Sequence, residues 1–290
     1  MGAGIAGFAW RLTLPGPMPM LAGPPGPQPT MPTLAANLSM LFTESPFPDR
    51  FAAAAKAGFR YVEYQFPYDF EKHAVAECAR SAGVQVVLHN IPSGNAAKGD
   101  RGIACLPERV DEFRAGVGRA IEYALAAGCP RLNCLAGVVP AGAPPERFHR
   151  TFVDNLRFAA GELGRAGLSL MIEPINSRTV PGFFLNGSAQ AAAILDEVGA
   201  DNAFIQYDLF HMQIMEGDLA MTMARLLPRI GHIQIADVPA RHEPGTGELN
   251  FGFLLAEIDR LGYGGAIGCE YNPANGTLPG LAWAAPYLEA

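Results

Sequence analysis

Four short apolar runs in the second half of the sequence each end on, or close to, a strongly polar side chain. These side chains are Glu173, Asp208, Gln234 and Glu270, and Asp237 follows Gln234 closely. Carboxylates that share one pocket repel one another unless a cation or shared protons compensate. All four side chains offer oxygen, which suits Mg²⁺ or Mn²⁺ better than zinc. We therefore expect Glu173, Asp208, Gln234 and Glu270 to hold Mg²⁺ or Mn²⁺.

Such a metal site predicts a particular class of chemistry. Four protein oxygens leave two positions of an octahedron open, and two adjacent oxygens of an α-hydroxycarbonyl compound can fill them. A compound held in this way has a more acidic C–H, and its enediolate is stabilised while a ligand carboxylate moves the proton. The four side chains thus predict metal-assisted proton transfer on a small hydroxy-oxo compound.

The elements that must position these side chains repeat one pattern from Leu34 onward. A short run rich in Val, Ile, Leu or Tyr precedes a polar or glycine-marked loop and then an amphipathic helical segment, as at 107–127, 146–165 and 188–198. The expected strands are 34–38, 61–64, 84–89, 131–135, 168–173, 203–208, 232–236 and 266–271. Eight such units favour a single closed (β/α)₈ TIM barrel over an open sheet, and no G-x-G-x-x-G follows the first strand. In this barrel the carboxyl ends of the strands surround one pocket.

Composition and the termini restrict the other possibilities. Residues 1–30 are dense in Gly and Pro and are expected to form a flexible extension before a catalytic barrel domain over 31–290. The net charge of −7 argues against nucleic-acid and anionic-membrane partners, and no apolar run is long enough to cross a bilayer. The five cysteines are odd in number and lack CxxC spacing, which indicates free thiols in a reducing cytoplasm.

Histidines and a glutamate at further strand ends are candidates for substrate binding. His211 stands three residues after Asp208 and is expected to contact a substrate oxygen, with capping of the next helix as the alternative. His89 ends the third strand and should also face the pocket. Glu63, at the end of the second strand, can hydrogen-bond one of the metal ligands or a substrate hydroxyl, or form a salt bridge with a mouth arginine. His232 should lie one layer deeper than Gln234, because side chains two positions apart share one face of a strand.

A carboxylate substrate needs a cationic partner in this acidic pocket. Arg101, in the long loop after the third strand, is the first candidate because a guanidinium binds a carboxylate through two hydrogen bonds. Lys98 and Arg241 are weaker candidates, and a solvated surface charge is the alternative for each of the three.

Nine short motifs, spread from about residue 35 to residue 287, closely resemble the hydroxypyruvate isomerase family within the xylose-isomerase-like barrels. The motifs are Ala-Asn-Leu-Ser-Met-Leu-Phe (36–42), Phe-Pro-Tyr-Asp (66–69), Arg-Gly-Ile-Ala-Cys (101–105), Asn-Cys-Leu-Ala-Gly (133–137), Ile-Glu-Pro-Ile-Asn (172–176), Gln-Tyr-Asp-Leu-Phe-His-Met-Gln (206–213), Gly-His-Ile-Gln-Ile-Ala-Asp (231–237), Glu-Pro-Gly-Thr-Gly-Glu (243–248) and Gly-Cys-Glu-Tyr (268–271).

This resemblance implies interconversion of hydroxypyruvate and 2-hydroxy-3-oxopropanoate (tartronate semialdehyde). It implies that Glu173 and Glu270 act as proton donor and acceptor, and it carries the metal ligands over to Glu173, Asp208, Gln234 and Glu270. Related ketose 3-epimerases have a histidine at the position of Gln234, so this departure favours the isomerase branch. Family members are often oligomeric, so a homodimer or homotetramer is expected.

Three other functions stay open at this point. The same chemistry on a slightly longer substrate would make the protein a 2-oxotetronate isomerase. Sugar 3-epimerisation also uses two carboxylates around an enediolate. A phosphodiesterase like the endonuclease-IV barrels is less compatible, because those barrels resemble this superfamily but use several metals with many histidine ligands. This chain has six histidines in all, of which His89, His211 and His242 are candidates for the mouth.

Overall fold

The computed structural model describes Met1 and residues 31–288. The expected extension over residues 1–30 therefore lies, apart from Met1, outside the described residues. The proposed catalytic domain over 31–290 is described except for its last two residues.

Eight parallel strands close into one barrel, in the order in which they occur along the chain. The ring closes where the first strand pairs with the eighth, with Ala35 opposite Gly268. The strands are β1 (Leu34–Asn37), β2 (Tyr61–Glu63), β3 (Gln85–Asn90), β4 (Arg131–Cys134), β5 (Ser169–Ile172), β6 (Ala203–Asp208), β7 (Ile230–Ile235) and β8 (Ile267–Cys269). The closed (β/α)₈ barrel predicted from the sequence is confirmed.

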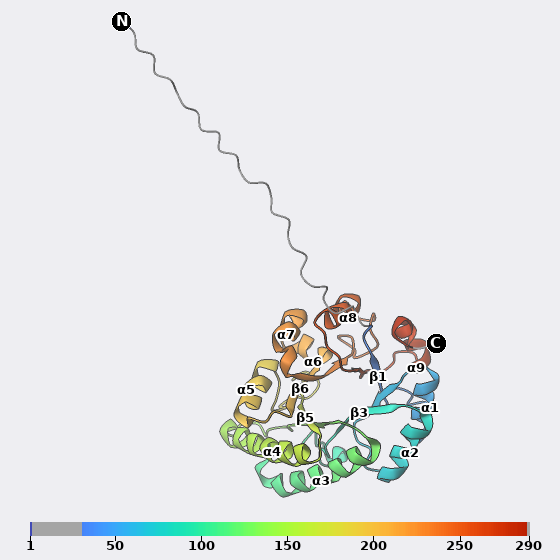
Figure 1. The fold of residues 1–290 in the computed structure, drawn as a ribbon. Coiled ribbons are helices and arrows are strands. Elements are labelled where there is room, and N and C mark those ends of the chain that lie inside the picture. The colour runs from blue at the N-terminus through green and yellow to red at the C-terminus, as the bar shows by residue number, and fades with distance from the viewer. Residues whose placement is uncertain (2–30, 289–290) are drawn as a thin grey trace.

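Helices surround the barrel on the outside (Figure 1). They are α1 (Phe47–Lys56), α2 (Lys72–Ala82), α3 (Val110–Ala127), α4 (Pro145–Arg165), α5 (Ser188–Val198), α6 (Leu209–Met215), α7 (Leu219–Leu226), α8 (Phe251–Arg260) and α9 (Thr277–Gly280). Short 3₁₀ turns occupy Ala96–Lys98, Pro107–Arg109, Leu227–Arg229 and Ala282–Tyr287. The expected helix from residue 107 thus begins with a 3₁₀ turn, and its α-helical part ends at Gly128 in the left-handed conformation (φ 65°).

The side chains of the barrel strands pack in two regions, an apolar one between the strands and the helices and a partly polar one inside the barrel. A large buried cluster lies between the strands and the helices, and a small cluster that includes Ala35, Leu88 and Met171 fills part of the barrel interior. Polar side chains take up the rest of the interior, and His232 and Gln234 are 0% and 1% exposed. Ile233, between them, belongs to the outer apolar cluster. This alternation directs polar groups of several strands toward the barrel axis.

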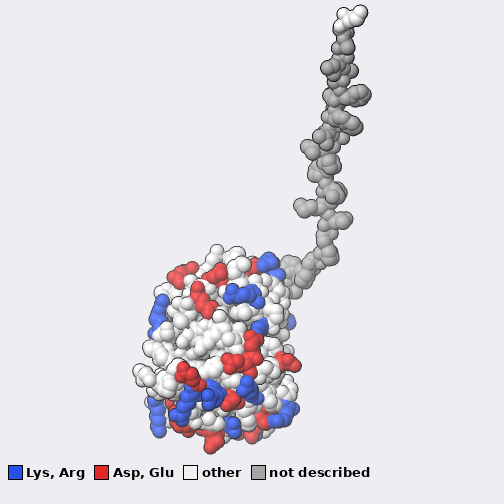
Figure 2. All heavy atoms as spheres, turned by 90° about the vertical axis from the view of Figure 1, so that its left-hand side faces the viewer, with Lys and Arg blue, Asp and Glu red and all other residues white. Residues whose placement is uncertain are grey.

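The described residues show how charge is distributed on the surface and which cysteines are free. Acidic and basic side chains are intermixed on the face that Figure 2 shows. Among the described residues no helix has the length and apolarity needed to span a membrane. Cys78, Cys105, Cys129, Cys134 and Cys269 are all free thiols. The absence of a disulfide framework, predicted from the cysteine count, is confirmed.

Candidate active site

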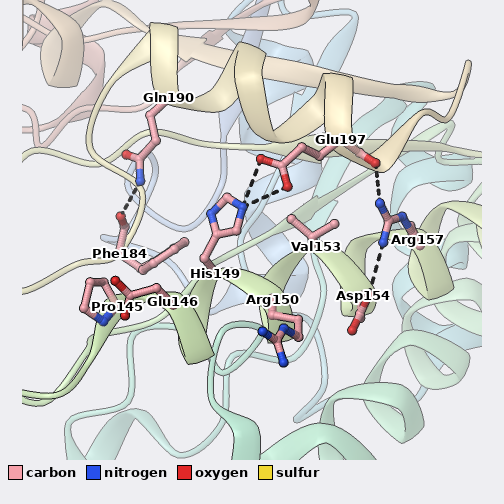
Figure 3. A pocket seen from close by; sticks show the side chains of 10 residues that line it. All are labelled: Pro145, Glu146, His149, Arg150, Val153, Asp154, Arg157, Phe184, Gln190 and Glu197. Carbon is pink, nitrogen blue, oxygen red and sulfur yellow. Dashed lines mark hydrogen bonds and ion pairs between the residues drawn. The ribbon is translucent and has the colours of Figure 1, made fainter.

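Two cavities of similar volume are candidates for a site. One, of about 510 Å³, is an open groove between α4 and α5 on the outside of the barrel. There His149 contacts Glu197 at 2.9 Å and Arg157 contacts Asp154 at 3.2 Å, and these side chains are largely exposed (Figure 3). Groups paired with one another in solvent have no unusual reactivity. The groove is therefore the weaker of the two candidates for a catalytic site.

The other cavity, of about 520 Å³, opens at the carboxyl ends of the strands. Its wall includes Glu173, His211, Arg241, Glu270 and, nearer the rim, Arg101. Glu173 and Glu270 are only 4% and 5% exposed, so the cavity concentrates ionisable groups that are almost removed from water. Buried titratable groups in a cleft mark this cavity as the candidate active site.

Glu173, Asp208 and His211 come together at the base of this cavity. One potential ligand atom from each lies within 4.8 Å of the others, and all three residues are buried. Asp208 ends β6 and caps α6 by accepting a hydrogen bond from the backbone N–H of Phe210 at 2.8 Å. The first turn of α6 therefore begins at the cavity and directs His211 toward Glu173, with 3.7 Å between Nε2 and Oε1.

The tautomer of His211 makes it a hydrogen-bond donor, whereas the carboxylates of Glu173 and Asp208 are acceptors. Its Nδ1 accepts a hydrogen bond from the backbone N–H of Asn176 at 3.2 Å, so in the neutral ring the proton is on Nε2. Burial holds the pKa of His211 well below its usual value, and the positive charge of Arg241 lowers it further. A neutral ring with Nε2–H toward the cavity is a hydrogen-bond donor and not a metal ligand. His211 is thus suited to a substrate oxygen, as the sequence predicts.

Glu270 lies against a cation that the sequence ranked as a weaker candidate. Its Oε2 accepts a hydrogen bond from Nη2 of Arg241 at 2.5 Å, and its Oε1 accepts from Asn37 at 3.1 Å and Gln65 at 2.9 Å. The same Nη2 is 3.4 Å from Oδ2 of Asp208. Arg241 is therefore inside the cavity, where its charge faces two of the expected metal ligands.

Burial changes the acidity of all three carboxyl groups. It raises the pKa of Glu173 well above its usual value, and the nearby charges of Glu270 and Asp208 raise it further. It raises the pKa of Asp208 to about 7, although Arg241 opposes the shift. The pKa of Glu270 is also raised by burial against the influence of Arg241. Three carboxyl groups thus share the site with one arginine and are held toward their neutral forms, and a divalent cation bound there would favour the ionised forms.

Gln234 is oriented by a hydrogen-bond network below the cavity. Its Nε2 donates to Oε1 of Glu63 at 2.7 Å, and its Oε1 accepts from Gln206 at 2.6 Å. Glu63 also accepts hydrogen bonds from Asn37 at 2.9 Å and from His232 at 2.6 Å. Because the carboxylate accepts, the amide nitrogen of Gln234 faces Glu63 and its oxygen faces the other way. That oxygen is hydrogen-bonded to Gln206 and Gln234 is not on the wall of the cavity, so its place among the metal ligands stays a prediction.

Glu63 itself is fully buried and is not on the wall of the cavity. In the described part of the chain its hydrogen-bond partners are Asn37, Gln234 and His232. The bond to Gln234 is the contact with an expected ligand that the sequence offers as one alternative, and a contact with a substrate hydroxyl stays a prediction. Gly268 of β8 makes room for it, because a Cβ there would lie 2.4 to 2.6 Å from the Glu63 carboxyl atoms. His232 lies at the inner level expected for it.

The two remaining candidates are at opposite depths. His89 is 0% exposed, stacks on Tyr64 with ring centroids 5.9 Å apart, and is not on the cavity wall. Burial lowers its pKa to about 4. Arg101 is on the wall at the exposed rim, where Nη1 donates to the backbone carbonyl of Asp100 at 2.8 Å. Arg101 therefore lines the cavity and His89 lies behind its wall, and substrate contact by either residue stays a prediction.

Several polar side chains at the site were not predicted. Asn133 of β4 donates to Oε2 of Glu173 at 2.8 Å, and Asn37 of β1 bridges Glu63 and Glu270. Both asparagines stand near the end of a strand, so the rule that identified the carboxylates could have identified them. Asn176 orients His211 from an irregular loop, where no periodic signal exists.

Comparisons with known proteins agree with this geometry. A family model described as a xylose isomerase-like TIM barrel matches residues 51–287. The hydroxypyruvate isomerase of Escherichia coli (strain K12) is 50% identical over 253 residues, which cover 87% of this chain and 98% of that protein. The 2-oxo-tetronate isomerase of Cupriavidus necator is 51% identical over 261 residues, covering 89% of this chain and 99% of that protein.

A solved structure gives the same architecture. The crystal structure of an AP endonuclease, family 2, from Brucella melitensis superimposes with a TM-score of 0.87 at 42% sequence identity, covering 89% of this chain and all of that one. The family resemblance carried by the nine motifs is confirmed. The chain belongs to the family of hydroxypyruvate and 2-oxo-tetronate isomerases within the xylose isomerase-like TIM barrels.

Proposed function

We propose that this protein interconverts hydroxypyruvate and 2-hydroxy-3-oxopropanoate, using Mg²⁺ or Mn²⁺ held by Glu173, Asp208, Gln234 and Glu270. The observation that carries the proposal is the convergence of three buried carboxyl groups with raised pKa values on one strand-end cavity. Relatives about half identical to this chain bear the names of isomerases for hydroxypyruvate and 2-oxo-tetronate. The ligand set of oxygens fits a hard divalent cation.

The side chains of the site divide the reaction between them. A bound divalent ion would withdraw electron density from two adjacent substrate oxygens. One of Glu173 and Glu270 removes the proton from the carbon that bears the hydroxyl group, the hydroxyl proton passes to the neighbouring carbonyl oxygen, and the other glutamate delivers a proton to the carbon of that carbonyl group. His211 donates Nε2–H to a substrate oxygen and steadies the charge of the enediolate. Arg241, deep in the cavity, and Arg101, at its rim, are the proposed partners of the substrate carboxylate.

The nearest alternative is a substrate longer by one carbon. Relatives named for hydroxypyruvate and for 2-oxo-tetronate are equally similar to this chain, at 50% and 51% identity. A cavity of about 520 Å³ accommodates either molecule. The metal and the two glutamates would act in the same way on both, so only relative turnover distinguishes them.

Epimerase and endonuclease functions receive less support. Solved 3-epimerases share this fold at about one-fifth identity, which concerns the architecture alone. The Brucella melitensis protein is called an AP endonuclease, yet in the described residues of this chain the one cluster with the spacing of metal ligands contains a single histidine, His211. A site for several metals with many histidine ligands is not what these side chains build.

The decisive assay supplies Mg²⁺ or Mn²⁺ and compares hydroxypyruvate, 2-oxo-tetronate and ketohexoses as substrates. We expect the highest kcat/KM with hydroxypyruvate and no C3 epimer from the ketohexoses. A higher kcat/KM with 2-oxo-tetronate would move the assignment to that substrate, and turnover of ketohexoses alone would contradict it. We further propose a cytoplasmic homodimer or homotetramer, in keeping with the free thiols and the family.

A further inference from the structure

A further buried carboxylate lies near the site, and within the described residues its hydrogen bonds come from backbone N–H groups. Asp237, just past the end of β7, is 1% exposed. Its Oδ1 accepts hydrogen bonds from the backbone N–H groups of Val238 at 2.9 Å and Leu249 at 3.1 Å. Its Oδ2 accepts from Gly245 at 2.9 Å and Gly247 at 2.8 Å. One side chain thus ties both ends of the loop over residues 238–250 together.

This loop carries Arg241, and the same aspartate fixes the turn in which Arg241 lies. The backbone N–H of Arg241 donates to the carbonyl of Asp237 at 2.9 Å, and the N–H of Asp237 donates to the carbonyl of His242 at 2.8 Å. Arg241 has a φ of 59°, in the left-handed region that residues with a side chain rarely adopt. Such a conformation persists only where the surroundings impose it.

At Gly247 the loop packs directly against Val238 and Asp237. A Cβ on Gly247 would lie 1.9 Å from the carbonyl oxygen of Val238 and 2.7 Å from Oδ1 of Asp237. Only glycine allows the loop to approach this closely. The loop conformation therefore depends on both the carboxylate and the missing side chain.

The consequence appears at the tip of Arg241. Its guanidinium reaches Glu270 at 2.5 Å and Asp208 at 3.4 Å, and its carbon Cζ is 5.1 Å from the ring centre of Phe210. We propose that Asp237 is a positioning residue that holds the loop of Arg241 so that the guanidinium faces the reacting carboxyl groups and the substrate carboxylate. The substrate part of this inference rests on the proposed function.

The variant Asp237→Asn tests the inference, because it replaces one acceptor oxygen with an NH₂ group that faces N–H donors. We expect the rate at which phenylglyoxal modifies Arg241, followed by peptide mass spectrometry, to rise about tenfold, with Arg101 as an internal reference. We expect KM for hydroxypyruvate to rise about tenfold to a hundredfold, the loss typical of a charged hydrogen bond. In the background of Arg241→Ala, Asp237→Asn should change kcat/KM no further.

Matched variants separate positioning from general stability. Asn250 caps α8 at the end of the same loop by accepting from Phe253 N–H at 3.1 Å, so Asn250→Ala should lower the melting temperature without altering Arg241 reactivity or KM. If Asp237→Asn folds poorly, Gly247→Ala serves in its place and should raise Arg241 reactivity and KM in the same way. The inference would be overturned if Arg241 reactivity were unchanged in both Asp237→Asn and Gly247→Ala. It would also be overturned if Asp237→Asn lowered kcat/KM further in the Arg241→Ala background. Failure of the wild type to isomerise hydroxypyruvate would instead refute the proposed function. The phenylglyoxal modification rates would then still show whether Asp237 positions Arg241.

Discussion

Arg241 and Glu270 form the closest ion pair of the candidate site, with Nη2 2.5 Å from Oε2. Within residues 31–288 Glu173, the other proposed proton carrier, has no ion pair with Lys or Arg, and its Oε2 accepts from the neutral amide of Asn133. Burial raises the pKa of both glutamates, but Arg241 opposes the shift more directly at Glu270. The two carboxyl groups are therefore unequal, as a donor and an acceptor of one proton must be.

Removal of the metal should abolish activity. Treatment with EDTA followed by gel filtration is expected to eliminate isomerisation, and added Mg²⁺ or Mn²⁺ should restore it, because the oxygen ligands favour these ions. The melting temperature should also fall on removal, since the ion stabilises the folded state that binds it. Full activity in metal-free enzyme would refute the metal assignment.

The space above Glu63 can be tested at Gly268. The variant Gly268→Ala places a methyl group within 2.4 to 2.6 Å of the Glu63 carboxyl atoms, so we expect a loss of about 1 to 3 kcal/mol in the free energy of unfolding. Displacement of Glu63 should also release the Gln234 amide and weaken Mn²⁺ binding about tenfold or more. Urea unfolding and Mn²⁺ titration measure the two effects.

A control for this variant is Gly118→Ala on α3, where a Cβ would meet nothing within 4 Å. It should leave Mn²⁺ affinity unchanged and keep or increase stability by up to about 1 kcal/mol, because alanine favours helix. If Gly268→Ala and Gly118→Ala had the same stability and Mn²⁺ affinity, Gly268 would not be needed to make room for Glu63.

Stability should depend on pH through His89. Burial lowers the pKa of His89 from 6.5 to about 4, so between these values the unfolded chain binds the proton more readily than the folded one. Stability is therefore lost as the pH falls from about 6.5 to 4, by up to about 3 kcal/mol from this group.

Urea unfolding of wild type and His89→Phe at pH 7 and pH 4.5 measures this contribution. The variant should lose less stability on acidification, whereas replacement of the exposed His73 by glutamine should leave the wild-type dependence intact. An identical pH dependence in wild type and His89→Phe would contradict the assignment.

Sequence reasoning recovered the barrel and its strand-end carboxylates because both follow from local rules. Alternation of apolar strands with helices defines the fold, and every parallel strand delivers its last side chain to the same rim. Glu173, Asp208 and Glu270 are found by that rule, and the structure places Glu173 and Glu270 on the wall of the cavity, with Asp208 buried beside Glu173. Their roles as metal ligands and proton carriers stay predictions.

The depth and direction of other side chains depend on contacts between distant parts of the chain. Glu63 meets His232 across 169 positions, and no periodicity in β2 reveals that β7 supplies its partner. Arg241 lies deeper in the cavity than Arg101 because the loop held by Asp237 turns Arg241 inward. The tautomer of His211 likewise depends on Asn176, which follows a different strand.

The central claim is that Glu173 and Glu270 each carry a proton during isomerisation. Turnover of hydroxypyruvate by Glu173→Gln and Glu270→Gln, with melting temperature as a check on folding, tests it most directly. We expect kcat to fall by about 10²- to 10⁴-fold or more in each folded variant, while the exposed Glu122→Gln keeps wild-type turnover. Turnover near the wild-type value in either folded variant would contradict the two-glutamate mechanism.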